Sequence, residues 1–164
     1  MQTVQHTLIA FIVVASSFAF VGLVGVPPAS AGTSYANRME SALAASTNRK
    51  RQQYGRHTVR GDSCLDRMAE AWARHLAETN TFAHRRMSTL LNRCNRSYVN
   101  ENIAKYPTRP GMSATEVARD TVRLWMKSDG HRHNLLAPKP RVIGVGVART
   151  PNGDWWVIVE NMAR

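Results

Sequence analysis

Acidic residues are scarce in this sequence and absent from its first fifth. The chain has 11 aspartate and glutamate residues against 22 lysine and arginine residues, which gives a formal net charge of +11. Residues 1–31 contain no charged side chain, so residues 32–164 carry the whole of this charge. A surface this basic favours anionic partners such as cell-envelope polymers or acidic lipid head groups.

Aromatic residues are also few, at 7% of the chain. They do not alternate with basic residues as they do in surfaces that stack nucleic-acid bases. The one short basic run, Arg49-Lys50-Arg51, is interpreted as a solvated helix end. Nucleic acid is therefore disfavoured as a partner.

Cysteine is limited to Cys64 and Cys94, and no Cys-x-x-Cys is present. A redox or zinc-knuckle motif is thus excluded, and in an exported chain the pair is expected to form one structural disulfide. The sequence also lacks His-Glu-x-x-His and the nucleophile elbow of serine hydrolases. Ser63 is interpreted as a helix cap, and Ser128 has no elbow around it.

The uncharged start of the chain predicts export. Residues 8–26 are almost wholly apolar, Pro27-Pro28 interrupts them, and Ala29-Ser30-Ala31 has the small-x-small pattern of a signal-peptidase site. We predict a signal peptide over residues 1–31, cleaved after Ala31, and a secreted or cell-envelope protein with no membrane-spanning segment after cleavage. The alternative is a retained anchor, because the segment before the apolar run lacks lysine and arginine and about twenty apolar residues can span a bilayer.

Hydrophobic periodicity predicts three main helices. The first covers residues 35–53 and ends at Tyr54-Gly55. The second begins at Asp62-Ser63, and its apolar face comprises Leu65, Met68, Ala69, Trp72, Ala73, Leu76 and Ala77. A short helical turn follows at residues 87–91. The third helix opens with a capping box at Ser113 to Glu116 and has a predicted buried face of Val117, Thr121, Leu124 and Trp125.

Strands are predicted at residues 98–104 and in a C-terminal hairpin. Residues 142–147 and 155–162 flank Asn152-Gly153, a strong turn signal. Gly144 and Gly146 lie inside a strand with no helix after them, so they do not form a dinucleotide-binding loop. They are expected to let a neighbouring element approach closely.

The segment 125–136, which we interpret as a loop after the third helix, contains His131 and His133 within three residues. His84 and Glu101 also fall at the ends of predicted elements, where side chains can meet at a cleft. Two imidazoles and a carboxylate hold Zn²⁺ with water as a fourth ligand, or perform general acid–base chemistry. His133 is a further candidate ligand, although its charged and polar neighbours favour a solvent-facing or capping role.

Four ordered segments resemble one known family. They are Phe82-Ala83-His84, the segment 101–104, the run from Trp125 to Pro138, and the glycine-rich segment 143–147 before an aromatic strand. Together they resemble the CAP superfamily of cysteine-rich secretory, venom-antigen and plant pathogenesis-related proteins, also called the SCP-like extracellular domain. The resemblance extends over residues 35–162 and is strongest to the bacterial branch.

This resemblance implies an α+β fold, a three-layer α-β-α sandwich with a small antiparallel sheet, formed here by a single domain over residues 32–164. It also implies a cleft with two histidines and two glutamates, of which His84, Glu101 and His131 carry over. The position of the second glutamate holds Ser128, and the adjacent Asp129 is expected to point elsewhere. Asn134 is expected to tie the segment to backbone groups.

The resemblance leaves three functions open. The first is an exported, monomeric module whose cleft binds a lipid, another ligand, a partner, or a divalent metal such as zinc. The second is a metal-dependent hydrolase in which His84 and His131 hold the ion and Glu101 activates water; Glu101 equally fits a role in orienting a histidine. The third is attachment to an anionic cell-envelope polymer through the basic surface alone.

Overall fold

The computed structural model describes residues 30–164, with side chains from Tyr35 onward. The predicted signal peptide, apart from its last two positions, lies outside the described residues. None of the described helices is long and apolar enough to cross a membrane.

A four-stranded sheet forms the middle layer of the molecule. Its strands, in the order in which they pair, are β1 (Arg60–Gly61), β3 (Val142–Arg149), β4 (Trp155–Ala163) and β2 (Val99–Pro107). The three long strands are antiparallel, as predicted, and β3 and β4 form the expected hairpin. β1 adds a parallel pairing at one edge, which the sequence did not predict because two residues are too few to show an alternating pattern.

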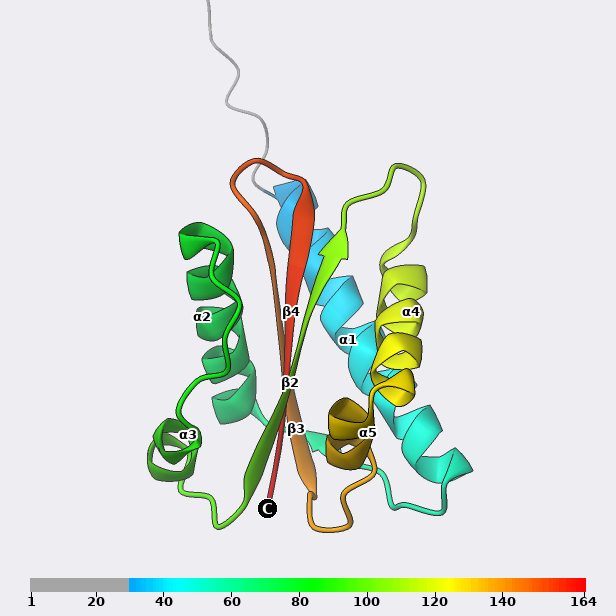
Figure 1. Ribbon diagram of the computed structural model, residues 1–164, viewed down its shortest axis with the longest axis vertical. Coiled ribbons are helices and arrows are strands. Elements are labelled where there is room, and N and C mark those ends of the chain that lie inside the picture. Colours follow the sequence, from blue (N-terminus) through cyan, green and yellow to red (C-terminus); the bar gives the residue numbers. More distant parts are fainter. Residues whose placement is uncertain (1–29) are drawn as a thin grey trace, which may run out of the picture.

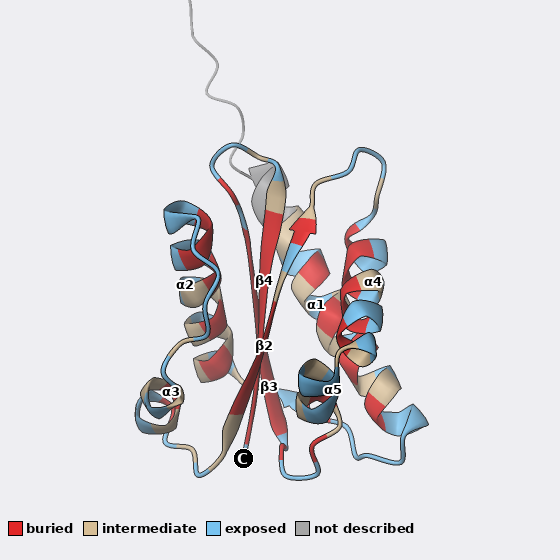
Figure 2. Ribbon diagram, viewed as in Figure 1, coloured by how far each residue is buried: buried red, intermediate tan, exposed pale blue. Residues whose placement is uncertain are grey.

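Helices cover both faces of the sheet (Figure 1). One face carries α2 (Ser63–Thr79) and α3 (Met87–Arg93), and the other carries α1 (Ser30–Gln53), α4 (Ala114–Lys127) and α5 (Asp129–Leu135). In the long helices the buried residues lie on the sides that face the sheet (Figure 2). The predicted three-layer α-β-α sandwich is therefore confirmed.

Local signals set the helix ends. The Asp62 side chain caps α2 by accepting a hydrogen bond from the Leu65 amide at 3.0 Å, and both bonds of the capping box form at Ser113 and Glu116. After α1 the chain turns at Gly55, which has a φ of 66°. Because a side chain is strained in that left-handed conformation, glycine favours the turn there.

The two glycines of β3 let α2 lie directly on the sheet, as expected. A Cβ atom on Gly144 would lie 2.2 Å from the carbonyl carbon of Leu65, and one on Gly146 would lie 2.1 Å from the amide nitrogen of Glu70. Only residues without a side chain fit at these positions.

Two predictions about the segment after residue 113 were wrong. Leu124 is 54% exposed, because the buried face of α4 is centred further round the helix and includes Ala118 and Val122 instead. The segment that begins at Trp125 is not a loop: α4 continues to Lys127, Ser128 adopts an extended conformation, and α5 follows at once. Gly130 lies within α5.

The basic run at the end of α1 is only partly solvated, which corrects its interpretation as a solvated helix end. Arg51 is 0% exposed. Its guanidinium donates hydrogen bonds to the carbonyl oxygens of His57, Leu135 and Ala137 at 2.9, 2.7 and 3.1 Å. Arg51 therefore joins the end of α1 to the end of α5.

Candidate functional site

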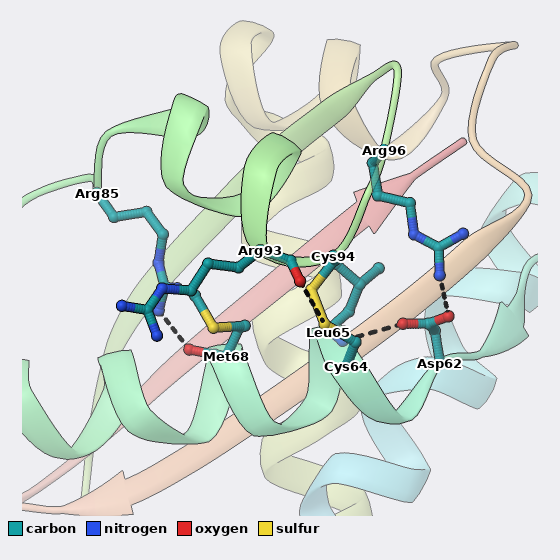
Figure 3. Close-up of a disulfide and its surroundings, with 8 residues drawn as sticks. All are labelled: Asp62, Cys64, Leu65, Met68, Arg85, Arg93, Cys94 and Arg96. Atoms are coloured by element: carbon teal, nitrogen blue, oxygen red, sulfur yellow. Dashed lines mark hydrogen bonds and ion pairs between the residues drawn. A yellow bond between two sulfur atoms is a disulfide. The ribbon is translucent and has the colours of Figure 1, made fainter.

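His84 lies on the segment between α2 and α3, and several contacts fix this segment. The Cys64–Cys94 disulfide, which confirms the predicted pairing, joins the start of α2 to the end of α3. Arg85 donates a hydrogen bond to the Met68 carbonyl, and Figure 3 shows this bond on the same side of α2 as the disulfide. His84 is thus held over the sheet although its own side chain is 55% exposed.

Glu101 projects from β2 beneath His84, and its side chain is only 1% exposed. Its Oε1 atom accepts hydrogen bonds from His84 Nδ1 at 2.9 Å and from the Arg85 amide at 3.2 Å. Its Oε2 atom lies 3.4 Å from Arg85 Nε. Burial raises the pKa of Glu101, while the hydrogen bonds from His84 and the Arg85 amide and the charge of Arg85 act in the opposite direction.

Sequence reasoning missed Arg85, whose side chain is 7% exposed. It follows His84 directly, yet nothing in the local pattern distinguishes it from the exposed Arg86. Its burial depends on Glu101 and on the ring of Trp72, which lies 5.2 Å from its guanidinium carbon. Only the folded chain brings these groups together.

His131 projects from α5, on the opposite face of the sheet from α2. Its Nδ1 atom is hydrogen-bonded to Ser128 Oγ at 2.9 Å, and its ring stacks on Trp125 with the centroids 6.2 Å apart. Burial lowers the pKa of His131, and the charge of a protonated His84 lowers it further. His131 therefore favours the neutral form, in which imidazole binds a metal or accepts a hydrogen bond.

Asn134 and Asn102 tie α5 to β2. Asn134 Nδ2 donates to the Glu101 carbonyl at 3.0 Å and to Asn102 Oδ1 at 3.1 Å, and Asn102 Nδ2 donates to the His131 carbonyl at 3.3 Å. These bonds hold α5, which carries His131, against β2, which carries Glu101, the hydrogen-bond partner of His84.

A cleft of about 420 Å³ separates the two histidines; it is lined by His84, Ser128, Gly130, His131, His133 and Asn134. Glu101 instead lines a neighbouring hollow of about 300 Å³, which shares His84 and Asn134 with the cleft. The structure therefore brings His84, His131, His133, Ser128 and Asn134 to one cleft. Glu101 is linked to that cleft through its hydrogen bond with His84. Asp129 is 92% exposed and pairs with Arg132 at 2.7 Å, outside the cleft.

Three histidines line the cleft. His133 is exposed on α5, as expected, whereas His84 and His131 each have one ring nitrogen bonded to a neighbour. In both of these rings that nitrogen is Nδ1, which leaves Nε2 as the remaining ligand atom. Over residues 35–164 there is no group of three or more His, Cys, Asp and Glu side chains arranged to hold a metal ion. Two nitrogens fit a divalent cation that completes its coordination with water or with a ligand, and they fall short of the three protein ligands of catalytic zinc sites.

The α-β-α sandwich is also the fold of SCP domains. Residues 44–160 match the CAP family, described as the cysteine-rich secretory protein family. The chain belongs to this family.

Individual relatives agree with this assignment. The chain is 30% identical over 124 residues to the uncharacterized protein YkwD of Bacillus subtilis (strain 168), covering 71% of this chain and 44% of that one. An extracellular SCP-domain protein of Bacillus anthracis has the same fold, with a TM-score of 0.69 and 21% identity over 85% of this chain and 45% of its own. The chain thus spans less than half the length of either protein.

An outer surface protein of Borrelia burgdorferi also shares the fold. Its TM-score is 0.62 at 19% identity, and the match covers 78% of this chain and 92% of that protein. The sandwich is therefore found both as part of longer proteins and as nearly the whole of a chain.

Proposed function

We propose that this protein is an exported binding module whose cleft holds a divalent metal ion between His84 and His131. One observation carries the proposal: both imidazoles line one cleft, and each has its Nδ1 atom fixed by a neighbour. A histidine that binds metal through Nε2 commonly donates its Nδ1 hydrogen to a carboxylate or another acceptor, which fixes the ring and makes Nε2 more basic.

Glu101 has the position of such an orienting carboxylate. Because an ionised carboxylate only accepts hydrogen bonds, its contact with His84 places the hydrogen on Nδ1 and the lone pair on Nε2. A metal bound there would supply Lewis acidity and open coordination positions for a ligand with oxygen or nitrogen donors. Ser128 orients the His131 ring, and Asn134 holds α5 in place.

The same geometry favours binding over hydrolysis. A general base must reach the water that it activates, whereas both oxygens of Glu101 already face His84 and Arg85. Ser128 stands where the family pattern has its second glutamate, so the cleft has no second carboxylate to take that role. Export is supported by the predicted leader, by the disulfide, and by neighbours described as extracellular or outer-surface proteins.

Calorimetric zinc titration tests the metal site. The full sequence would be expressed with its own leader and purified from the medium, where a chain that begins at Gly32 is expected. The His84→Ala/His131→Ala variant should lose the strongest zinc site, because both nitrogen ligands are removed. His75→Ala is the control, since His75 is exposed on α2 away from the cleft. Equal zinc affinity in the double variant and the wild type would refute the proposal.

A further inference from the structure

A second hollow, of about 310 Å³, lies where the end of α1 meets α5. It is lined by Arg56, Asp129, Arg132, His133, Leu136, Ala137 and Pro138, and we call it the basic pocket. It shares only His133 with the histidine cleft. The proposed metal site makes no use of Arg56 or Arg132.

The guanidinium groups at the basic pocket are available to an anion. Arg56 forms no ion pair within the part of the chain that the structure describes. Arg132 is paired only with Asp129, whose side chain is 92% exposed. Exposed ion pairs contribute little free energy, so an incoming anion displaces this carboxylate at low cost.

Buried and neighbouring arginines add positive potential around the pocket. Arg51 lies fully buried and donates to the carbonyl of Ala137, a residue of the pocket wall. The Arg51 Nη2 atom has no hydrogen-bond partner in the described structure. Arg141 donates to the Pro138 carbonyl at 2.9 Å. Two carbonyl groups of the pocket wall thus already accept hydrogen bonds from arginines.

We propose that the basic pocket binds the phosphate groups of a polyol-phosphate polymer, an anionic chain without bases. The planar guanidinium group of arginine can donate two hydrogen bonds to two phosphate oxygens. Arg56 and Arg132, with the His133 imidazole beside them, therefore suit a phosphodiester. No Phe, Tyr or Trp lines the pocket, so it offers no platform for stacking nucleic-acid bases.

The test measures binding of a fluorescent poly(glycerol phosphate) chain to the exported, purified protein by anisotropy. Arg56→Gln/Arg132→Gln should weaken binding about tenfold, because two charge-assisted contacts are lost. The matched control is Arg67→Gln/Arg119→Gln, which removes the same charge from exposed positions on α2 and α4. It should change the dissociation constant less than twofold. Thermal unfolding of each variant establishes that it is folded.

Further measurements distinguish binding of the polymer from binding of nucleic acid or of a lipid surface. Single-stranded DNA of equal charge and vesicles containing phosphatidylglycerol should bind more weakly than the polymer. His84→Ala should leave polymer binding unchanged, because His84 does not line the basic pocket. The proposal is overturned if both double variants lose binding equally, if neither loses it, or if DNA or vesicles bind more tightly through the same two arginines.

Discussion

Glu101 is a buried acid that orients His84, a residue of the histidine cleft, although Glu101 does not line that cleft itself. It accepts from His84 and from the Arg85 amide, and its second oxygen faces the Arg85 guanidinium. A buried carboxylate is costly unless its charge is compensated. The arginine stabilises the charge of Glu101, and Glu101 in turn fixes the histidine ring.

Ser128 is the residue at which the cleft differs most from the pattern implied by the family. Ser128→Glu should strengthen zinc binding by about tenfold, because a carboxylate next to His131 either joins the metal site or orients the ring more firmly. The measurement is zinc calorimetry at constant pH.

Ser97→Glu is the control for this substitution, since Ser97 is exposed and the change in charge is the same. An equal gain in both variants would mean that only the net charge of the protein matters. It would contradict a specific role for position 128.

The sequence was sufficient to nominate His84, Glu101 and His131, but it could not predict the charged partners around them. The histidines stand in motifs with a recognisable order. Arg85 and Arg51 resemble any surface arginine, because the burial of a charge depends on partners far away in the chain: Arg51 bonds to carbonyls 84 and 86 residues further on. Single residues in loops and at helix ends were therefore the hardest to place.

Among the elements, those with a long regular pattern were predicted well. α2, α4 and the β3–β4 hairpin follow from periodicity, capping residues and Asn152-Gly153. α5 was taken for a loop because seven residues with a glycine and two histidines carry little helical signal. Its helical form depends on hydrogen bonds to β2 through Asn134 and Asn102.

Two glycine-to-alanine substitutions should change stability in opposite directions, one through close packing of a helix on the sheet and the other through helix propensity. Gly144→Ala should destabilise the protein by about 3 kcal/mol, because the new methyl group overlaps the backbone of α2 and forces the helix off the sheet. Gly130→Ala meets open space within α5, and alanine favours the helix by about 0.5 kcal/mol. Urea unfolding monitored by tryptophan fluorescence measures both.

Gly130→Ala serves as the control for Gly144→Ala, since both add one methyl group. Similar free energies of unfolding for the two variants would contradict the direct packing of α2 on β3.

At the scale of the whole molecule, side chains bond to backbone groups near both edges of the sheet. Beyond the short β1, the amides of Val145 and Val147 donate to Asp66 and Glu40, each at 3.0 Å. At the other edge, the Ile103 carbonyl accepts from Trp125 Nε1 at 3.2 Å. An edge strand whose polar groups are already bonded is a poor template for pairing with another chain.

The carboxylate bonded to β3 through the Val147 amide should make stability depend on pH. Burial raises the pKa of Glu40 from 4.5 to about 7; the Val147 amide and Arg74 oppose this shift, and the negative charges of Glu70 and Asp66 add to it. Between pH 4.5 and 7 the folded chain therefore holds a proton at this site that the unfolded chain has released. Stability from this group is complete below pH 4.5 and is lost as the pH rises through about 7.

Glu40→Gln isolates that contribution, because glutamine resembles the protonated acid at every pH. Relative to wild type, the free energy of unfolding of the variant should rise from pH 4.5 to pH 8, as measured by urea unfolding at each pH. Glu160, whose pKa burial also raises to about 7, is unchanged in both proteins and cancels in the difference. Glu78→Gln is the control, because it removes the same charge from the exposed face of α2. A flat difference for Glu40→Gln would mean that Glu40 is ionised throughout this pH range and takes up no extra proton in the folded protein.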